Sequence, residues 1–160
     1  MKFSKEDARA AKKVVLEMLA DRGIPDNIVV KVKTIKKHPE WLALYRSRTQ
    51  FRGHGPIFWV NENLPEIVER IESELDETHG RSAHLDPLTV TVDTLLHEYG
   101  HVVYEYATVR PDQFTIDVLE RWPDQEEFAE DFIEYIRSGW IDPSYEKVID
   151  EYKKAVFVEE

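Results

Sequence analysis

Residues 95–103 read Leu-Leu-His-Glu-Tyr-Gly-His-Val-Val and contain the pattern His-Glu-x-x-His. On an α-helix, residues four apart lie one turn above each other on one face, so His97 and His101 can bind a single cation. At about 100° per residue, one sector of this helix collects polar groups: Thr94, His97, Glu98, His101 and Glu105. The opposite sector is apolar: Leu95, Leu96, Tyr99, Val102, Val103 and Tyr106. The stretch predicts a helix with one face in the core and the other carrying metal ligands.

The pattern also predicts a chemistry. If His97 and His101 bind Zn²⁺, Glu98 can take a proton from the water that the metal activates. A plainer interpretation is that both histidines coat a solvated helix. The amphipathic placement of the motif favours the metal site.

His97-Glu98-Tyr99-Gly100-His101 resembles the active-site helix of the zinc metallopeptidases known as zincins, including the Gly before the second His. The resemblance implies one zinc ion per chain, an activated water and hydrolysis of peptide bonds. The branch of the family depends on the third ligand. One branch has a Gly and a third His a few residues after the motif, and residues 102–110 contain neither.

A second amphipathic stretch, near 123–138, can supply the third ligand. Its acidic candidates are Glu126, Glu127, Glu130 and Asp131. Its apolar stripe consists of Phe128, Ala129, Phe132, Ile133, Tyr135 and Ile136. Glu126 borders this stripe, whereas Glu127 lies almost opposite it, where a carboxylate is usually solvated. Glu126 is therefore favoured and Glu127 comes second.

Glu126-Glu127-Phe128-Ala129-Glu130 is similar to the Glu-x-x-Ala/Ser-acid helix of the gluzincin branch. That resemblance implies that Glu126 binds zinc and that Glu130, in place of the more usual Asp, steadies a ligating histidine. If the pattern is aligned with Glu127–Asp131 instead, its last position is the usual Asp, but Glu130 then stands where the pattern has Ala or Ser. The donor that stabilises the oxyanion is left open among Tyr104, Tyr135, His79, His84 and Arg110.

Composition indicates one soluble globular domain, residues 1–160. Hydrophobic residues make up 42% and charged residues 33% of the chain, and this length can bury one core. The net charge of −11 disfavours binding of nucleic acid to a basic surface. There is no cysteine, so neither thiolate ligands nor disulfides are available. Without a secretory signal or a membrane-length apolar run, we expect a cytoplasmic protein with no membrane partner.

The remaining stretches predict the scaffold. Ser4 and Asp7 form a capping-box pattern at the start of a helix that Gly23 and Pro25 end. Strands are expected over 28–36, 41–51 and 57–61, the first two paired with each other. Pro56 suits an edge strand, along which a peptide substrate could bind, although a central core strand is an equal alternative. Further helices are expected at 63–75, 87–107, 114–119, 123–138 and from 143 onward.

The predicted fold class is α+β: a minimal zincin-like domain with a small twisted sheet of about three strands and packed helices. The predicted function is that of a zinc-dependent peptidase (hydrolase) with Glu98 as general base and a peptide or protein as substrate. The alternative is a catalytically silent zincin-like module that binds zinc and serves as a regulatory or interaction domain. The acidic C-terminus could also lie in the cleft and restrain activity.

Overall fold

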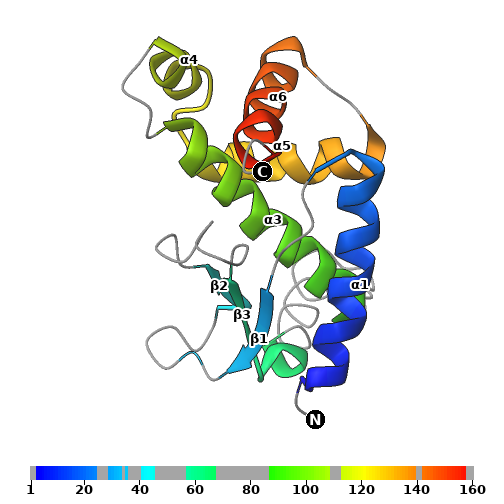
Figure 1. Cartoon of the computed structure of the whole chain (residues 1–160). Helices are drawn as coiled ribbons and strands as arrows, with labels where there is room; N and C mark the ends of the chain where they lie inside the picture. The colour runs from blue at the N-terminus through cyan, green and yellow to red at the C-terminus, as the bar shows by residue number, and fades with distance from the viewer. Residues whose placement is uncertain are drawn as a thin grey trace, which may run out of the picture.

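The helix that carries His97 and His101 is α3 (Pro87–Thr108), and it runs diagonally through the molecule (Figure 1). The computed structural model describes residues 3–24, 29–33, 35, 41–45, 57–67, 87–108, 113–139 and 142–157. The other elements are α1 (Lys5–Asp21), β1 (Val29–Lys33), β2 (Ala43–Tyr45), β3 (Ile57–Asn61), α4 (Gln113–Arg121), α5 (Gln125–Ser138) and α6 (Pro143–Phe157). The predicted α+β class is confirmed.

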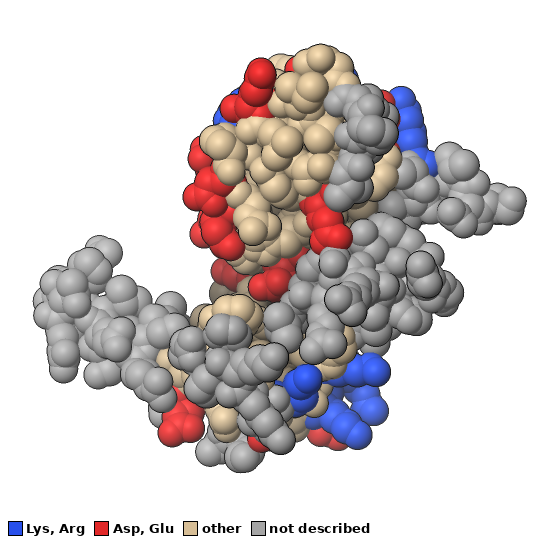
Figure 2. Space-filling model, turned by 90° about the vertical axis from the view of Figure 1, so that its left-hand side faces the viewer, with Lys and Arg blue, Asp and Glu red and all other residues tan. Residues whose placement is uncertain are grey.

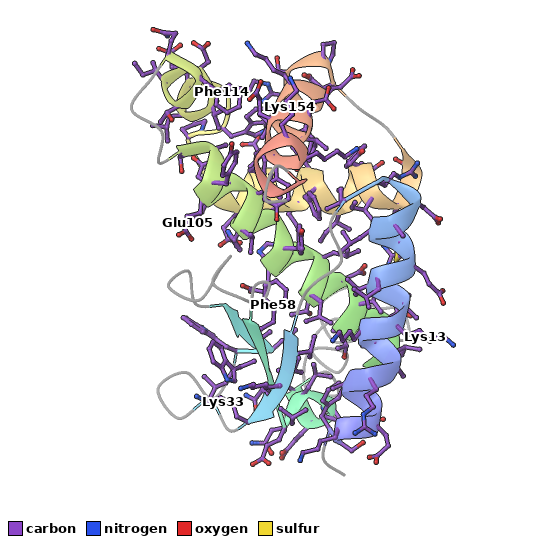
Figure 3. All side chains as sticks on the ribbon, in the orientation of Figure 1. Lys13, Lys33, Phe58, Glu105, Phe114 and Lys154 are labelled. Atoms are coloured by element: carbon purple, nitrogen blue, oxygen red, sulfur yellow. The ribbon has the colours of Figure 1, made fainter. Side chains whose placement is uncertain are left out.

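The two faces of α3 divide as its sequence predicts. Its apolar residues are buried in the core: Leu95, Leu96, Tyr99, Val102 and Val103. Tyr99 stacks on Phe132 of α5 with ring centroids 5.6 Å apart, and its hydroxyl lies 2.9 Å from that of Tyr152 of α6. On the sheet side, Phe58 lies between β3 and α3 (Figure 3). Packing on both sides holds α3 helical despite its β-branched first turns.

The three strands form one mixed sheet in the order β1-β3-β2. β3 pairs in parallel with β1 and antiparallel with β2. The predicted pairing of the first two strands is therefore wrong, and of the two equal alternatives for 57–61 the structure has the central strand and not the edge strand. β3 has Phe58 and Val60 fully buried, and a central position covers both of its edges. The edges of the described sheet are β1 and β2.

Local signals fix the ends of α1 and α5. Ser4 and Asp7 form the predicted capping box: the Ser4 hydroxyl accepts from the Asp7 amide at 3.1 Å, and the Asp7 carboxylate accepts from the Ser4 amide at 2.9 Å. The Asp124 side chain accepts from the Glu126 amide at 3.0 Å at the start of α5. Gly139 ends α5 with φ of 76°, a left-handed conformation that glycine adopts without strain.

α5 packs across α3 in an antiparallel sense, because Asp93 pairs with Arg137 while Tyr104 bonds to Trp122 just before α5. Gly100 makes this approach possible. A Cβ atom at Gly100 would lie 2.8 Å from the Ala129 Cα atom, closer than atoms of this kind approach in proteins. The acidic face of α5 is thereby held against the polar face of α3.

Several predictions concern segments beyond the described residues. Residues 64–67 are helical, but residues 68–75 of the expected 63–75 helix and the last residues of the C-terminus lie outside the described part of the chain. None of the helices in the described ranges has the length and apolar character that crossing a membrane requires.

Candidate metal centre

A cleft of about 1230 Å³ runs along the polar face of α3. α3 forms its floor, α5 borders one side, and the start of β2 with the preceding residues Trp41 and Leu42 borders the other. Every residue of the predicted polar sector lines it: Thr94, His97, Glu98, His101 and Glu105. The face that sequence periodicity separates from the core is therefore open to a ligand.

Three potential ligand atoms meet in this cleft. The Nε2 atoms of His97 and His101 lie 3.1 Å apart. The Glu126 carboxylate lies 2.7 Å from His97 Nε2 through one oxygen and 3.3 Å from His101 Nε2 through the other. Within the described residues, these are the His, Asp and Glu side chains whose ligand atoms converge closely enough to hold a metal ion.

Glu130 contacts the outer ring nitrogen of His97. Its carboxylate lies 3.1 Å from His97 Nδ1, and a carboxylate only accepts hydrogen bonds, so Nδ1 can donate to it. In the neutral ring that carries its hydrogen on Nδ1, the lone pair is on Nε2, which faces His101 and Glu126. A carboxylate holding the outer nitrogen is the usual support of a metal-binding histidine.

The donor set fits zinc. Lone pairs on two imidazole nitrogens and a carboxylate repel one another at these distances unless a proton or a cation lies among them. With Zn–N and Zn–O bonds of about 2.0–2.2 Å, the edges of a tetrahedral site are about 3.3 Å long. The 3.1 Å between the two Nε2 atoms is close to this length. One Glu126 oxygen lies 2.7 Å from the His97 Nε2 atom, and the other lies 3.3 Å from the His101 Nε2 atom.

The electrostatics of His101 also suit a ligand. Burial lowers the pKa of His101, and the neighbouring His97 lowers it further, while Glu126, Gln125 and Asp124 oppose the shift. The neutral ring, which has a lone pair to offer, is therefore favoured. His101 Nδ1 is buried and makes no hydrogen bond that meets normal geometry within the described part of the chain, although the Gln125 side chain is close enough to act on the ring.

Glu98 lies beside His97 and Glu126 but does not contribute one of the three potential ligand atoms. Burial raises the pKa of the Glu98 carboxyl from 4.5 to about 7; the charge of His97 counteracts this rise and that of Glu126 adds to it. A carboxyl group poised near neutrality can both accept and release a proton in that range.

The structure separates the remaining candidates. Glu127 is exposed and lies outside the cleft lining, and the Asp131 carboxylate accepts a hydrogen bond from Trp122 Nε1 at 3.0 Å. The Tyr104 hydroxyl is committed to the Trp122 carbonyl oxygen at 2.6 Å. Tyr135 is buried away from the cleft, against Tyr145 and beneath Arg22. Of these four residues, only Tyr104 lines the cleft.

His79, His84 and Arg110, the loop candidates for an oxyanion donor, lie outside the described residues. Among the described cleft residues there is no Lys or Arg.

Two features of the site escaped sequence reasoning. One is the contact between Gly100 and Ala129, for which the signal was a glycine in the middle of a strongly helical stretch. The other is the cleft wall at Trp41, Leu42 and Ala43, which follows from the sheet order and has no local signal.

No known family, curated protein or solved structure matches this chain. The chemistry of the site rests on its residues and their geometry.

Proposed function

We propose that this protein is a zinc-dependent peptidase of the gluzincin type on a minimal zincin-like fold. The observation that carries the proposal is the convergence of His97 Nε2, His101 Nε2 and a Glu126 oxygen in an open cleft beside Glu98. Three protein ligands with one open position are the pattern of catalytic zinc sites, whereas structural sites use four protein ligands.

His97, His101 and Glu126 would hold the metal, and Glu130 would keep the His97 ring in the ligating tautomer and orientation. Zinc, when bound, supplies Lewis-acid polarisation of the scissile carbonyl and lowers the pKa of a water molecule toward about 7. The Glu98 carboxylate accepts the proton of the attacking water and then donates it to the leaving amine nitrogen.

The sheet offers a place for the substrate backbone. β2 is a sheet edge in the described structure, and its first residue Ala43 lines the cleft with Trp41 and Leu42. An extended peptide can pair with such an edge through main-chain hydrogen bonds. The carbonyl group of the peptide bond to be cleaved would then lie between β2 and the metal ligands of α3.

The direct test is Glu98→Gln, with Glu127→Gln as the matched control on the exposed side of α5. Glu98→Gln removes the base but none of the three ligands, so we expect zinc content to stay at one per chain while peptide hydrolysis falls by about 10²–10⁴-fold. Glu127→Gln should change neither quantity. The substrate is a quenched fluorescent peptide library.

If the wild type binds zinc but cleaves no peptide in the library, the enzyme assignment fails. A metal-stabilised binding module would then be the better description. If the wild type binds no zinc, both descriptions fail.

A further inference from the structure

We propose that the cleft selects basic peptide segments, with Lys or Arg side chains of the substrate reaching the carboxylates that line it. This inference rests on the proposed peptidase function and names its substrate class. Its basis is the charge of the cleft wall together with the sheet edge and the metal ligands that the same cleft contains.

The cleft lining is strongly acidic. Among the described residues that line it, six are carboxylates and none is Lys or Arg: Asp93, Glu98, Glu105, Glu126, Glu130 and Glu134. Figure 2 shows acidic side chains at the recess between the upper helical part and the lower part of the molecule. The side chain of Glu105 projects from α3 away from α1 (Figure 3).

Neighbouring groups neutralise only part of the negative charge of these carboxylates. Asp93 pairs with Arg137 at the rim, and Glu126 and Glu130 face the His97 ring. Glu134 accepts only a hydrogen bond from the neutral Ser138 hydroxyl, at 3.3 Å, and forms no ion pair with the described residues. A bound Zn²⁺ would offset the charge at its three ligands, whereas Glu134 lies about two helical turns of α5 beyond the ligand Glu126.

The arrangement of these acids differs from that of an ordinary solvated face. Glu126, Glu130 and Glu134 are spaced four apart on α5, so they form one row of like charges, and like charges at this spacing destabilise a helix. The only basic residue of α5 is Arg137. A row that weakens its own helix and points into a cleft is expected where a cation is bound.

The opposite wall suits the stems of basic side chains. Trp41 is 40% exposed and lines the cleft beside Leu42 and Ala43. Aliphatic stems of Lys and Arg pack on apolar surface, and their charged ends are attracted to indole faces. A peptide paired with β2 would alternate its side chains between the two walls.

The test measures binding without turnover, on the zinc-loaded Glu98→Gln protein. The probes are a fluorescein-labelled peptide rich in lysine and a matched peptide with glutamine in place of every lysine. Their binding is measured by fluorescence anisotropy. We expect the lysine peptide to bind about tenfold tighter at low ionic strength, as two exposed ion pairs allow. The preference should shrink in high salt, because the screening length falls from about 10 Å at 0.1 M to about 3 Å at 1 M.

Two further variants, Glu134→Gln and Glu127→Gln, are each combined with Glu98→Gln. They distinguish the effect of charge in the cleft from the effect of the net charge of the protein. Both remove one exposed carboxylate from α5, but only Glu134 lines the cleft. We expect the Glu134 change to weaken binding of the lysine peptide about two- to fivefold, with no effect on the matched glutamine peptide or on zinc content. The Glu127 change should leave both affinities unchanged. Equal affinity for the two peptides, or equal losses in the two variants, would overturn the inference.

Wild-type protein then separates this inference from the proposed function. If the wild type cleaves both peptides at the same kcat/KM, the substrate class is wrong and the peptidase stands. If the lysine peptide binds selectively and stays intact, the recognition stands and the peptidase fails.

Discussion

Gly100→Ala tests whether the close approach of α3 and α5 builds the metal site. In the interior of a helix, replacing glycine by alanine ordinarily stabilises the protein by about 1 kcal/mol. At Gly100 the new Cβ would meet the Ala129 Cα atom at 2.8 Å, the Phe132 Cβ atom at 3.1 Å and the Ala129 Cβ atom at 3.2 Å. The shortest of these contacts is to backbone, so no rotamer change relieves it.

The required displacement sets the magnitude. Ordinary contact begins at 3.4 Å, so the backbone at Ala129 must move by about 0.6 Å, the difference between 3.4 Å and 2.8 Å. Inserting a methyl group into a packed core costs about 1–3 kcal/mol. After the gain in helix propensity of about 1 kcal/mol, the free energy of unfolding should fall by about 1 kcal/mol and by no more than about 2. Glu126 moves with α5, so zinc affinity should fall by about tenfold, as when a ligand loses its outer support.

The assay is urea unfolding with a chelator present, together with a zinc titration against a chromogenic competitor. Ala129→Gly is the control: it should lower the free energy of unfolding by about 1 kcal/mol through helix propensity while zinc affinity stays near that of the wild type. In the double variant the two losses should be less than additive, because the Cβ–Cβ contact is gone. A Gly100→Ala protein as stable as the wild type, with unchanged zinc affinity, would show that the close approach of α3 and α5 does not build the metal site.

The other predictions concern protons and hydrogen bonds at the site. In metal-free protein the folded-state pKa of Glu98 is about 7 against 4.5 for the free group, so the folded state retains a proton that the unfolded state loses, and stability should fall as pH rises from about 4.5 to 7. Glu98→Gln should therefore match the wild type in urea unfolding at pH 5 and exceed it by up to about 3 kcal/mol at pH 8; equal stability at both pH values would contradict this. Glu130→Gln should weaken zinc binding by about 10–100-fold in a competitor titration, and unchanged affinity would mean that Glu130 does not support His97. Tyr104→Phe leaves the buried Trp122 carbonyl without its donor and should lower the free energy of unfolding by about 1–3 kcal/mol while peptidase kcat stays near that of the wild type; a large loss of kcat would return Tyr104 to the catalytic candidates.

The helices could be predicted from sequence because their signals are local. The apolar spacing of Leu95, Leu96 and Tyr99 defined the buried face of α3, and the apolar stripe of residues 123–138 predicted α5. The choice of Glu126 over Glu127 followed from the same periodicity, and the structure places Glu126 against both histidines.

Strand pairing could not be predicted in the same way, because it depends on contacts between distant segments. The strands at 29–33 and 43–45 are neighbours in sequence, yet both pair with β3, whose Phe58 and Val60 gain most from a central position. Tertiary packing also determined the surroundings of Tyr104 and Tyr135, which the sequence could not predict. Periodicity left Tyr104 and Tyr135 beside the ligand sectors, whereas packing committed the first to Trp122 and buried the second against Tyr145.

The most direct measurement is zinc binding by the wild type compared with Glu126→Gln and Glu127→Gln, made by competitor titration and metal analysis. If His97, His101 and Glu126 hold one Zn²⁺, the wild type and Glu127→Gln bind one zinc per chain with equal affinity, and Glu126→Gln binds far more weakly. Absence of zinc binding in the wild type, or a loss caused by Glu127→Gln and not by Glu126→Gln, would contradict the account.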